Sequence, residues 1–364
     1  MTQKKKIAFL IPSLSTGGAE RVVVLLANKF IEKFEVFVIV LNKTETVYSV
    51  DKEVTIIYLQ EKYLPSSSLF EAIKSNFVYV KKICKTVKTN QIDILIGFTT
   101  SVNILTIISS MFLNKPNLIS ERNNPEVSVP NIFWKFFRDL TYPFTNGLIV
   151  QTDFNRKFYQ KIIKKNKIKV IPNPIDKSIF SARKDYCERE NIILTVGRLD
   201  VNKNQRLLFE AFTNLNVGNW KLVIAGDGVL REEYKKLTAY LGIADKVDFV
   251  GNVANVSDYY NKAKIFVFTS KSEGFPNALL EAMSFGLPCI STDCPSGPSE
   301  IIKNNENGFL IDVNNKSQLE KKLTDLMNNP KLCIEFSAKA LKSTERFEIQ
   351  EIYKQWETLI LKLT

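Results

Sequence analysis

The stretch KIAFLIPSLSTGGAERVVVLLANKFIEK, residues 6–33, passes from a short apolar run into a segment of helical periodicity. Its first part, Lys6–Ile11, is typical of a buried strand, and Glu20–Lys33 is typical of the helix that follows such a strand. The same alternation continues as far as Ile168–Ile171. Strands that are separated by helices form parallel sheets, so the sequence predicts an α/β domain here.

A second alternating series runs from Ile192–Val196 to Ser317–Met327. Between the two series, Pro172 and Pro174 resist both helix and strand. We therefore predict two Rossmann-like, doubly wound domains that face each other across a ligand cleft. The expected boundaries are a first domain over 1–172, a linker over 173–190, a second domain over 191–345, and a C-terminal helix over 346–364 that packs back on the first domain.

Composition excludes several classes of protein. The 364 residues exceed what one core usually holds, and 45% apolar with 24% charged residues is typical of a soluble globular chain. Histidine is absent, which excludes Ser-His-Asp catalysis and HExxH zinc chemistry.

The five cysteines form no CxxC pair and predict free thiols. The N-terminal run is broken by Pro12 and does not resemble a signal peptide, so we expect a cytoplasmic protein.

The formal charge of +12 indicates an anionic partner, and composition alone leaves three open: nucleic acid, anionic lipid and phosphorylated small molecules. Surface lysine that only improves solubility is the alternative explanation.

Glycines stand where predicted strands turn into helices. Gly17 and Gly18 follow the first strand, where backbone N–H groups can approach an anion at a helix start, although taken alone the pair favours a plain tight turn. Gly226, Gly228 and Gly251 follow later strands, and there a ligand ring could lie against bare backbone. A role as ordinary turn glycines stays open.

Two cations follow the first strand of the second domain. Arg198 and Lys203 lie just past its carboxyl end, where they can converge on a diphosphate. The alternative is a pair of solvated surface cations.

The segment SEGFPNALLE, residues 272–281, contains two carboxylates in different settings. Pro276 suits the first position of a helix, which puts Glu273 in the loop before it and Glu281 in its second turn. A loop carboxylate can accept hydrogen bonds from sugar hydroxyls, and one inside the helix can accept a pair from ribose. The helix start can hold phosphate oxygens through the amides of Asn277, Ala278 and Leu279.

These motifs together resemble glycosyltransferase family 4, whose members are retaining enzymes with the two-domain GT-B fold. The resemblance rests on E-x7-E at Glu273 and Glu281, GR-x4-K at 197–203, GDG at 226–228 and GGAERV at 17–22, and it covers nearly the whole chain. The stretches 120–125 and 293–302 are similar to the branch that assembles bacterial capsule, exopolysaccharide and O-antigen repeat units.

The resemblance implies a role for each motif. Arg198 and Lys203 would bind the donor diphosphate, Glu281 the ribose, and Glu273 with the backbone of Phe275, Pro276 and Asn277 the transferred sugar. Gly17 and Gly18 would border the donor phosphates. Many members carry a histidine in the first domain, where this chain has Glu121, Arg122 and Asn123, so these three are acceptor-side candidates.

The expected reaction is transfer of a hexose or N-acetylhexosamine from a nucleotide sugar, with UDP as the expected base, to a lipid-linked acceptor. No cofactor and no metal are expected, because the chain has no DxD sequence. The segment 131–138 combines aromatic residues with Lys135 and Arg138, and it fits either an interfacial contact with an anionic membrane at the inner face or an ordinary core helix with a basic outer face.

Two other function classes remain as alternatives. A non-catalytic or nucleic-acid-binding protein would use the positive charge but leaves Glu273 and Glu281 unexplained, and no basic-aromatic module is recognised. A phosphorylase or epimerase of the same fold would need residues that this chain lacks.

Overall fold

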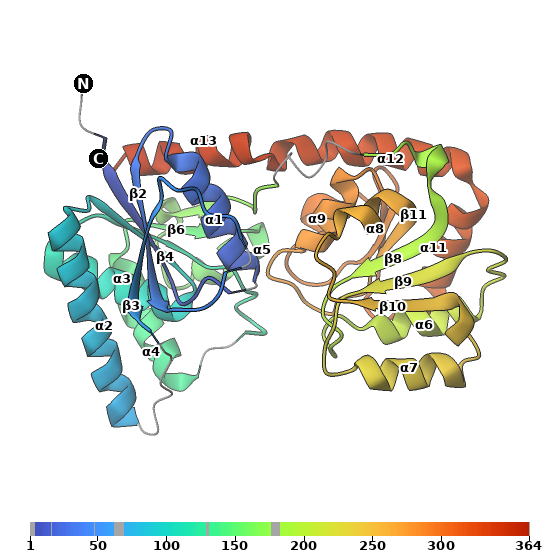
Figure 1. The fold of residues 1–364 in the computed structure, drawn as a ribbon, viewed down its shortest axis with the longest axis horizontal. Helices are drawn as coiled ribbons and strands as arrows, with labels where there is room; N and C mark the ends of the chain where they lie inside the picture. Colours follow the sequence, from blue (N-terminus) through green and yellow to red (C-terminus); the bar gives the residue numbers. More distant parts are fainter. Residues whose placement is uncertain are drawn as a thin grey trace. The chain divides into compact units, whose positions relative to one another are not determined.

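The computed structural model describes residues 4–15, 17–46, 48–61, 69–128, 131–175 and 183–363. The chain divides into two compact units (Figure 1). Unit 1 contains Met1–Pro174 and Ile349–Thr364, and unit 2 contains Ile175–Glu348.

Unit 1 is built on a parallel sheet whose described strands follow the order β3-β2-β1-β4-β5-β6-β7. The strand β1 is almost wholly buried because the sheet is covered on both faces, which explains its unbroken apolar sequence. The bounds are β1 (Lys6–Ile11), β2 (Glu35–Asn42), β3 (Thr55–Gln60), β4 (Ile94–Phe98), β5 (Asn117–Ser120), β6 (Gly147–Val150) and β7 (Ile168–Val170).

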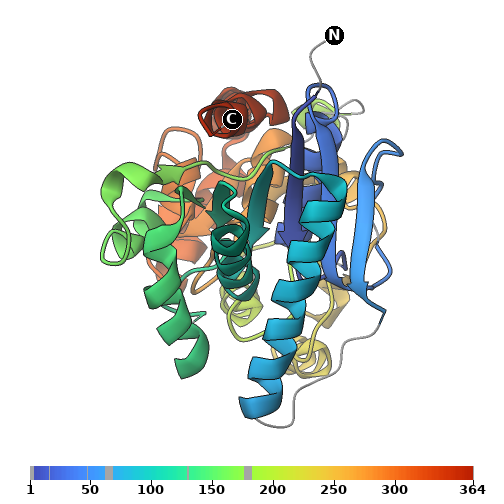
Figure 2. The ribbon, with the colours of Figure 1, turned by 90° about the vertical axis from the view of Figure 1, so that its left-hand side faces the viewer.

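The helices of unit 1 fall on two sides of this sheet. The helices α1 (Gly18–Phe30) and α13 (Ile349–Leu361) share one hydrophobic cluster with the strands. On the other side, α2 (Leu69–Asn90), α3 (Thr100–Leu113) and α4 (Ile132–Thr141) lie next to one another (Figure 2). The short 3₁₀ helix η1 (Tyr142–Phe144) and the helix α5 (Asp153–Tyr159) complete this layer.

Unit 2 repeats the design with a parallel sheet of order β10-β9-β8-β11-β12-β13 in the described residues. Its strands are β8 (Glu190–Val196), β9 (Lys221–Ala225), β10 (Val247–Gly251), β11 (Ala263–Phe268), β12 (Cys289–Thr292) and β13 (Phe309–Ile311). Its helices are α6 (Gln205–Thr213), α7 (Arg231–Tyr240), α8 (Ser257–Lys262), α9 (Asn277–Ser284), α10 (Pro298–Ile301), α11 (Lys316–Asn328) and α12 (Pro330–Thr344).

The C-terminal helix α13 belongs to the core of unit 1. The ring of Trp356 is fully buried and stacks on Phe98 of β4, with ring centroids 5.8 Å apart and 11° between the planes. Tyr353, one turn earlier, lies 4.7 Å from the Phe30 ring of α1. The last helix of the chain therefore covers a sheet whose strands were formed by its first half.

The prediction of two doubly wound α/β domains is confirmed. The structure divides the chain differently from the expected linker 173–190, because Ile175 already pairs with Glu348 inside unit 2. Arg189 is also part of unit 2, where its buried guanidinium donates to the carbonyl of Phe285. At the other end, Phe347 stays in unit 2 and contacts the ring of Phe275. The expected linker segment 176–182 lies outside the described residues.

Candidate active site

The two acids of SEGFPNALLE lie at the carboxyl end of β11, where it turns into α9. Pro276 is the residue before the helix rather than its first residue, so that detail of the prediction is wrong. Its φ of −83° and ψ of 74° lie outside the helical region and are typical of an inverse γ-turn. Glu273 is in the loop and Glu281 is the fifth residue of α9, as the spacing predicted.

The start of α9 offers fewer free amides than expected. The N–H of Asn277 donates to the carbonyl of Phe275 at 3.0 Å, and that of Leu280 donates to Pro276 at 3.0 Å. Within the described residues, no backbone carbonyl accepts from the N–H groups of Ala278 and Leu279. The prediction of three phosphate-holding amides is therefore reduced to these two.

Lys203 and Glu273 form an ion pair, although they are 70 residues apart in the chain. The Lys203 Nζ lies 2.6 Å from the Glu273 Oε1, and the side chains are only 20% and 10% exposed. The ammonium also lies 5.0 Å from the centre of the Phe268 ring. A poorly solvated pair of this kind holds both charges in fixed positions at the end of β11.

The loop that carries Lys203 is held by residues that the sequence reasoning did not single out. The Oδ1 of Asp200 accepts from the N–H groups of Asn202 at 3.0 Å and Lys203 at 2.9 Å. The side chain of Asn202 donates to the carbonyl of Ser272, and the hydroxyl of Thr269 donates to that of Lys203. The Asp-x-Asn spacing is typical of an Asx turn and could have indicated this loop.

Arg198 is placed differently from Lys203. Its side chain is 81% exposed, and its Nε lies 3.4 Å from Asp200 Oδ2. The structure therefore brings Lys203 and Glu273 together but leaves Arg198 on the surface at the end of β8.

Gly226 and Gly228, which follow β9, lie against the backbone of the loop after β8, where a side chain would not fit. Gly226 has φ of +135°, and a Cβ on it would lie 2.1 Å from the carbonyl oxygen of Gly197. A Cβ on Gly228 would lie 2.4 Å from the carbonyl oxygen of Leu199. Gly251 lies beside the guanidinium of Arg231, which would be 3.0 Å from a Cβ. Close approach of two loops thus explains Gly226 and Gly228, and their contact with a donor stays a prediction.

Glu281 is 9% exposed and accepts a hydrogen bond from the hydroxyl of Tyr260 at 3.1 Å. Tyr260 is fully buried on α8, a helix that the sequence reasoning did not predict. It fixes one carboxylate oxygen of Glu281.

In unit 1, the first helix start already has a carboxylate beside it. The N–H of Gly17 donates to the hydroxyl of Tyr48 at 3.1 Å, and Glu20 lies so close that a Cβ on Gly17 would be 2.2 Å from its Oε2. Burial raises the pKa of Glu20 above its ordinary value. The carboxylate of Glu20 therefore lies where Gly17 and Gly18 are predicted to bind an anion, and it would compete with that anion for the helix start.

Glu121 and Arg122 lie in the interior of unit 1 at the end of β5. Glu121 accepts hydrogen bonds from the hydroxyls of Tyr142 and Thr100 and the amide of Asn103. Burial raises its pKa, and the hydrogen bond from Tyr142 lowers it in part.

Arg122 donates to Asn173 Oδ1 at 2.7 Å, and its guanidinium lies 5.0 Å from the ring of Phe98 and 5.7 Å from that of Trp356. Burial lowers its pKa to about 9. The side chain of Asn123 is exposed, and its carbonyl accepts from Asn155. Among the three acceptor-side candidates, only Asn123 is thus open to solvent.

No group of three or more His, Cys, Asp or Glu in the described residues could hold a metal ion. No helix in that part of the chain is long and apolar enough to cross a membrane.

Comparisons with known proteins define the class of this site. Residues 16–178 match the model of Glycosyltransferase Family 4, and residues 176–343 match that of Glycosyl transferases group 1. Over 361 residues the chain is 34% identical to the GalNAc-alpha-(1->4)-GalNAc-alpha-(1->3)-diNAcBac-PP-undecaprenol alpha-1,4-N-acetyl-D-galactosaminyltransferase of Campylobacter jejuni, with 98% of this chain and 99% of that protein covered. It is 25% identical to the amylovoran biosynthesis glycosyltransferase AmsD of Erwinia amylovora, with 98% and 99% covered.

Among solved structures, Anabaena Alr3699/HepE in complex with UDP has the same fold. The TM-score is 0.82 at 18% identity, with 98% of this chain and 100% of that chain covered.

The two Rossmann-like units and the matched models define a glycosyltransferase of the GT-B fold. The chain belongs to glycosyltransferase family 4, in the branch of bacterial exopolysaccharide and O-antigen enzymes, as the motifs predicted.

Proposed function

We propose that this protein is a retaining glycosyltransferase that moves a hexose or N-acetylhexosamine from a UDP-sugar to a lipid-linked acceptor in bacterial surface polysaccharide synthesis. The poorly exposed ion pair of Lys203 and Glu273, in the loop that leads into α9 with its two free amides, is the observation that supports it most strongly. It combines a cation and helix-start donors for a diphosphate with a carboxylate for sugar hydroxyls.

In this proposal the chemical step is a front-face substitution. The acceptor hydroxyl oxygen forms a bond to the anomeric carbon, the bond from that carbon to the diphosphate breaks, and a diphosphate oxygen takes the proton. Lys203, with Ala278 and Leu279, stabilises the charge that develops on the leaving group. Arg198, which is 81% exposed, closes on the diphosphate only when the donor is bound.

The carboxylates orient the donor. Glu281, with one oxygen fixed by Tyr260, accepts from the ribose hydroxyls, and Glu273 accepts from the sugar. Orientation of this kind contributes to rate by positioning the reacting atoms.

The lipid-linked acceptor is proposed from two Campylobacter jejuni relatives, whose names describe acceptors on undecaprenol. An acceptor of this kind places the reaction at the inner face of the cell membrane, with the protein in the cytoplasm.

Donor binding is expected to raise the melting temperature. A ligand that binds only the folded protein stabilises it by about 2.7 kcal/mol at 100 times its Kd. Thermal-shift measurements with UDP-, GDP- and ADP-sugars should give an increase of several degrees for UDP-sugars and a smaller one for the others. The exposed-site variant Lys236→Ala serves as a control with an unchanged shift. The absence of a shift with every donor contradicts the proposal.

Transfer is expected to proceed without a divalent metal. Lys203, Arg198 and the start of α9 supply the positive charge that a metal would otherwise bring to the diphosphate. The rate should be the same after dialysis against EDTA as after addition of Mg²⁺. Activity that is lost in EDTA and restored by Mg²⁺ counts against metal independence.

A further inference from the structure

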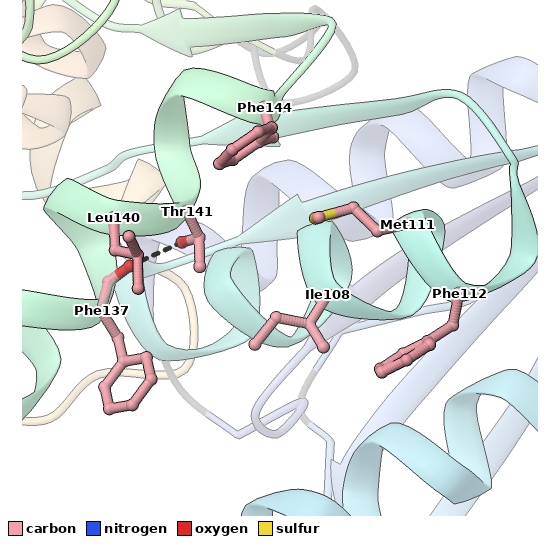
Figure 3. A pocket seen from close by; sticks show the side chains of 7 residues that line it. All are labelled: Ile108, Met111, Phe112, Phe137, Leu140, Thr141 and Phe144. Atoms are coloured by element: carbon pink, nitrogen blue, oxygen red, sulfur yellow. Dashed lines mark hydrogen bonds between the residues drawn. The ribbon is translucent and has the colours of Figure 1, made fainter.

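The outer surface of unit 1 carries large apolar side chains on α3, α4 and η1. Figure 3 shows several of them around an apolar groove of about 540 Å³. The exposed members of this surface, here called the α3–α4 face, are Met111 (56%), Phe112 (72%), Ile132 (88%), Phe136 (62%), Leu140 (53%) and Phe144 (58%). Exposed apolar side chains gathered around a groove on a folded unit are typical of an interaction site.

The helix α4 packs Trp134 and Phe137 against the core of unit 1 but also presents a row of apolar side chains to the outside. Ile132, Phe136 and Leu140 recur every four residues and point outward. Arg138 is 4% exposed, donates to Asp139 and lies over the rings of Phe158 and Tyr159. The expectation that Arg138 contacts lipid headgroups is therefore wrong, and the exposed side of α4 combines these apolar side chains with Lys135.

Positive charge lies beside the α3–α4 face. The neighbouring helix α2 packs against α3 (Figure 2). It exposes Lys74, Lys81, Lys85 and Lys88, and α4 exposes Lys135. Besides the buried Arg138, the sequences of α2, α3 and α4 contain six lysines and only two acidic residues. An apolar centre with a basic border complements a bilayer that has an acyl interior and anionic headgroups.

We propose that the α3–α4 face docks on an anionic lipid bilayer, with its apolar side chains entering the acyl region and the α2 lysines contacting the headgroups. This docking rests on the proposed function in one respect: the lipid-linked acceptor of that function would be presented at the same bilayer.

Sedimentation with vesicles tests the docking in the full-length protein. The probes are vesicles of phosphatidylcholine alone and of phosphatidylcholine with 30% phosphatidylglycerol. The wild type is expected to pellet with the anionic vesicles and to be released by salt. The variant Phe112→Ser/Ile132→Ser/Phe136→Ser should bind at least tenfold more weakly, since three apolar anchors are lost. Its matched control is Val229→Ser/Tyr240→Ser/Ile334→Ser, which removes exposed apolar side chains of unit 2 and should bind as the wild type does.

A charge variant tests the basic border. Lys81→Glu/Lys85→Glu/Lys88→Glu should weaken binding by about fivefold or more per residue. The unit 2 variant Lys236→Glu/Lys331→Glu/Lys342→Glu changes the net charge by the same amount. Its vesicle binding should weaken much less, which separates the effect of position from that of net charge.

Two vesicle results overturn the docking: no binding of the wild type to anionic vesicles, or equal binding of the wild type and the serine variant. A third result is a wild-type dimer in light scattering that binds no vesicles and that the serine substitutions convert to a monomer. The last outcome would assign the face to a second copy of the chain. Thermal shifts with UDP-sugars, measured without vesicles, separate this inference from the proposed function, because they depend on unit 2 residues and not on the α3–α4 face.

Discussion

Replacement of Lys203 by methionine is expected to lower kcat by about 10²- to 10³-fold, equivalent to about 2.7–4 kcal/mol of transition-state stabilisation. Of the two cationic side chains proposed to bind the diphosphate, Lys203 is held in place by an ion pair and is only 20% exposed, whereas Arg198 is largely exposed. Charge on the leaving diphosphate grows during the reaction, so a fixed ammonium contributes more in the transition state than in the ground state. Steady-state kinetics with a UDP-sugar and the acceptor would measure the loss.

The ion pair with Glu273 complicates the interpretation of this variant. Removing Lys203 alone leaves a poorly solvated carboxylate, which can destabilise the fold by about 3–5 kcal/mol. The double variant Lys203→Met/Glu273→Gln removes both charges. It is expected to regain most of the melting temperature while kcat stays low. Recovery of activity together with stability would mean that Lys203 serves only to neutralise Glu273, and the catalytic role would be abandoned.

Replacement of Trp356 by alanine is expected to destabilise unit 1 by about 3–5 kcal/mol. The indole is fully buried, stacks on Phe98 and lies 5.7 Å from the guanidinium of Arg122. Its loss leaves a cavity between α13 and the sheet and removes one of the two rings that contact a buried cation. Urea unfolding would measure the change, and hydrogen exchange would locate it.

The exchange experiment has an internal reference. Amides of β1 and β4 in unit 1 should exchange faster in the variant, whereas those of β8 and β11 in unit 2 should keep their rates. Leu361→Ala, at the end of the same helix and 54% exposed, is the matched control and should change stability by less than about 0.5 kcal/mol. Equal acceleration in both units would contradict a role for Trp356 confined to unit 1.

Much of the fold and half of the candidate site could be predicted from local sequence. Strand and helix periods are local properties of the sequence, and they suffice to predict both parallel sheets. Glu273 and Glu281 were found because Pro276 marks a helix start, although proline is compatible with the position before a helix as well as with the first position in it. That ambiguity explains the one-residue error.

The remaining features depend on contacts between distant segments. The pairing of Lys203 with Glu273 requires two loops to meet across 70 residues of chain. The burial of Arg138 requires the rings of α5, because the sequence of α4 has apolar residues on more than one face. The environment of the Arg122 guanidinium depends on Trp356 near the far end of the sequence. None of these could be derived from spacing.

The bridge between Ile175 and Glu348 has a consequence for biosynthesis. Unit 2 is a continuous segment that is entered and left at neighbouring residues, whereas unit 1 is interrupted by it. During translation the ribosome completes unit 2 before it makes α13. The aromatic surface of β4 at Phe98 therefore stays uncovered until α13 emerges, so unit 1 completes its core only after the whole of unit 2 has been made.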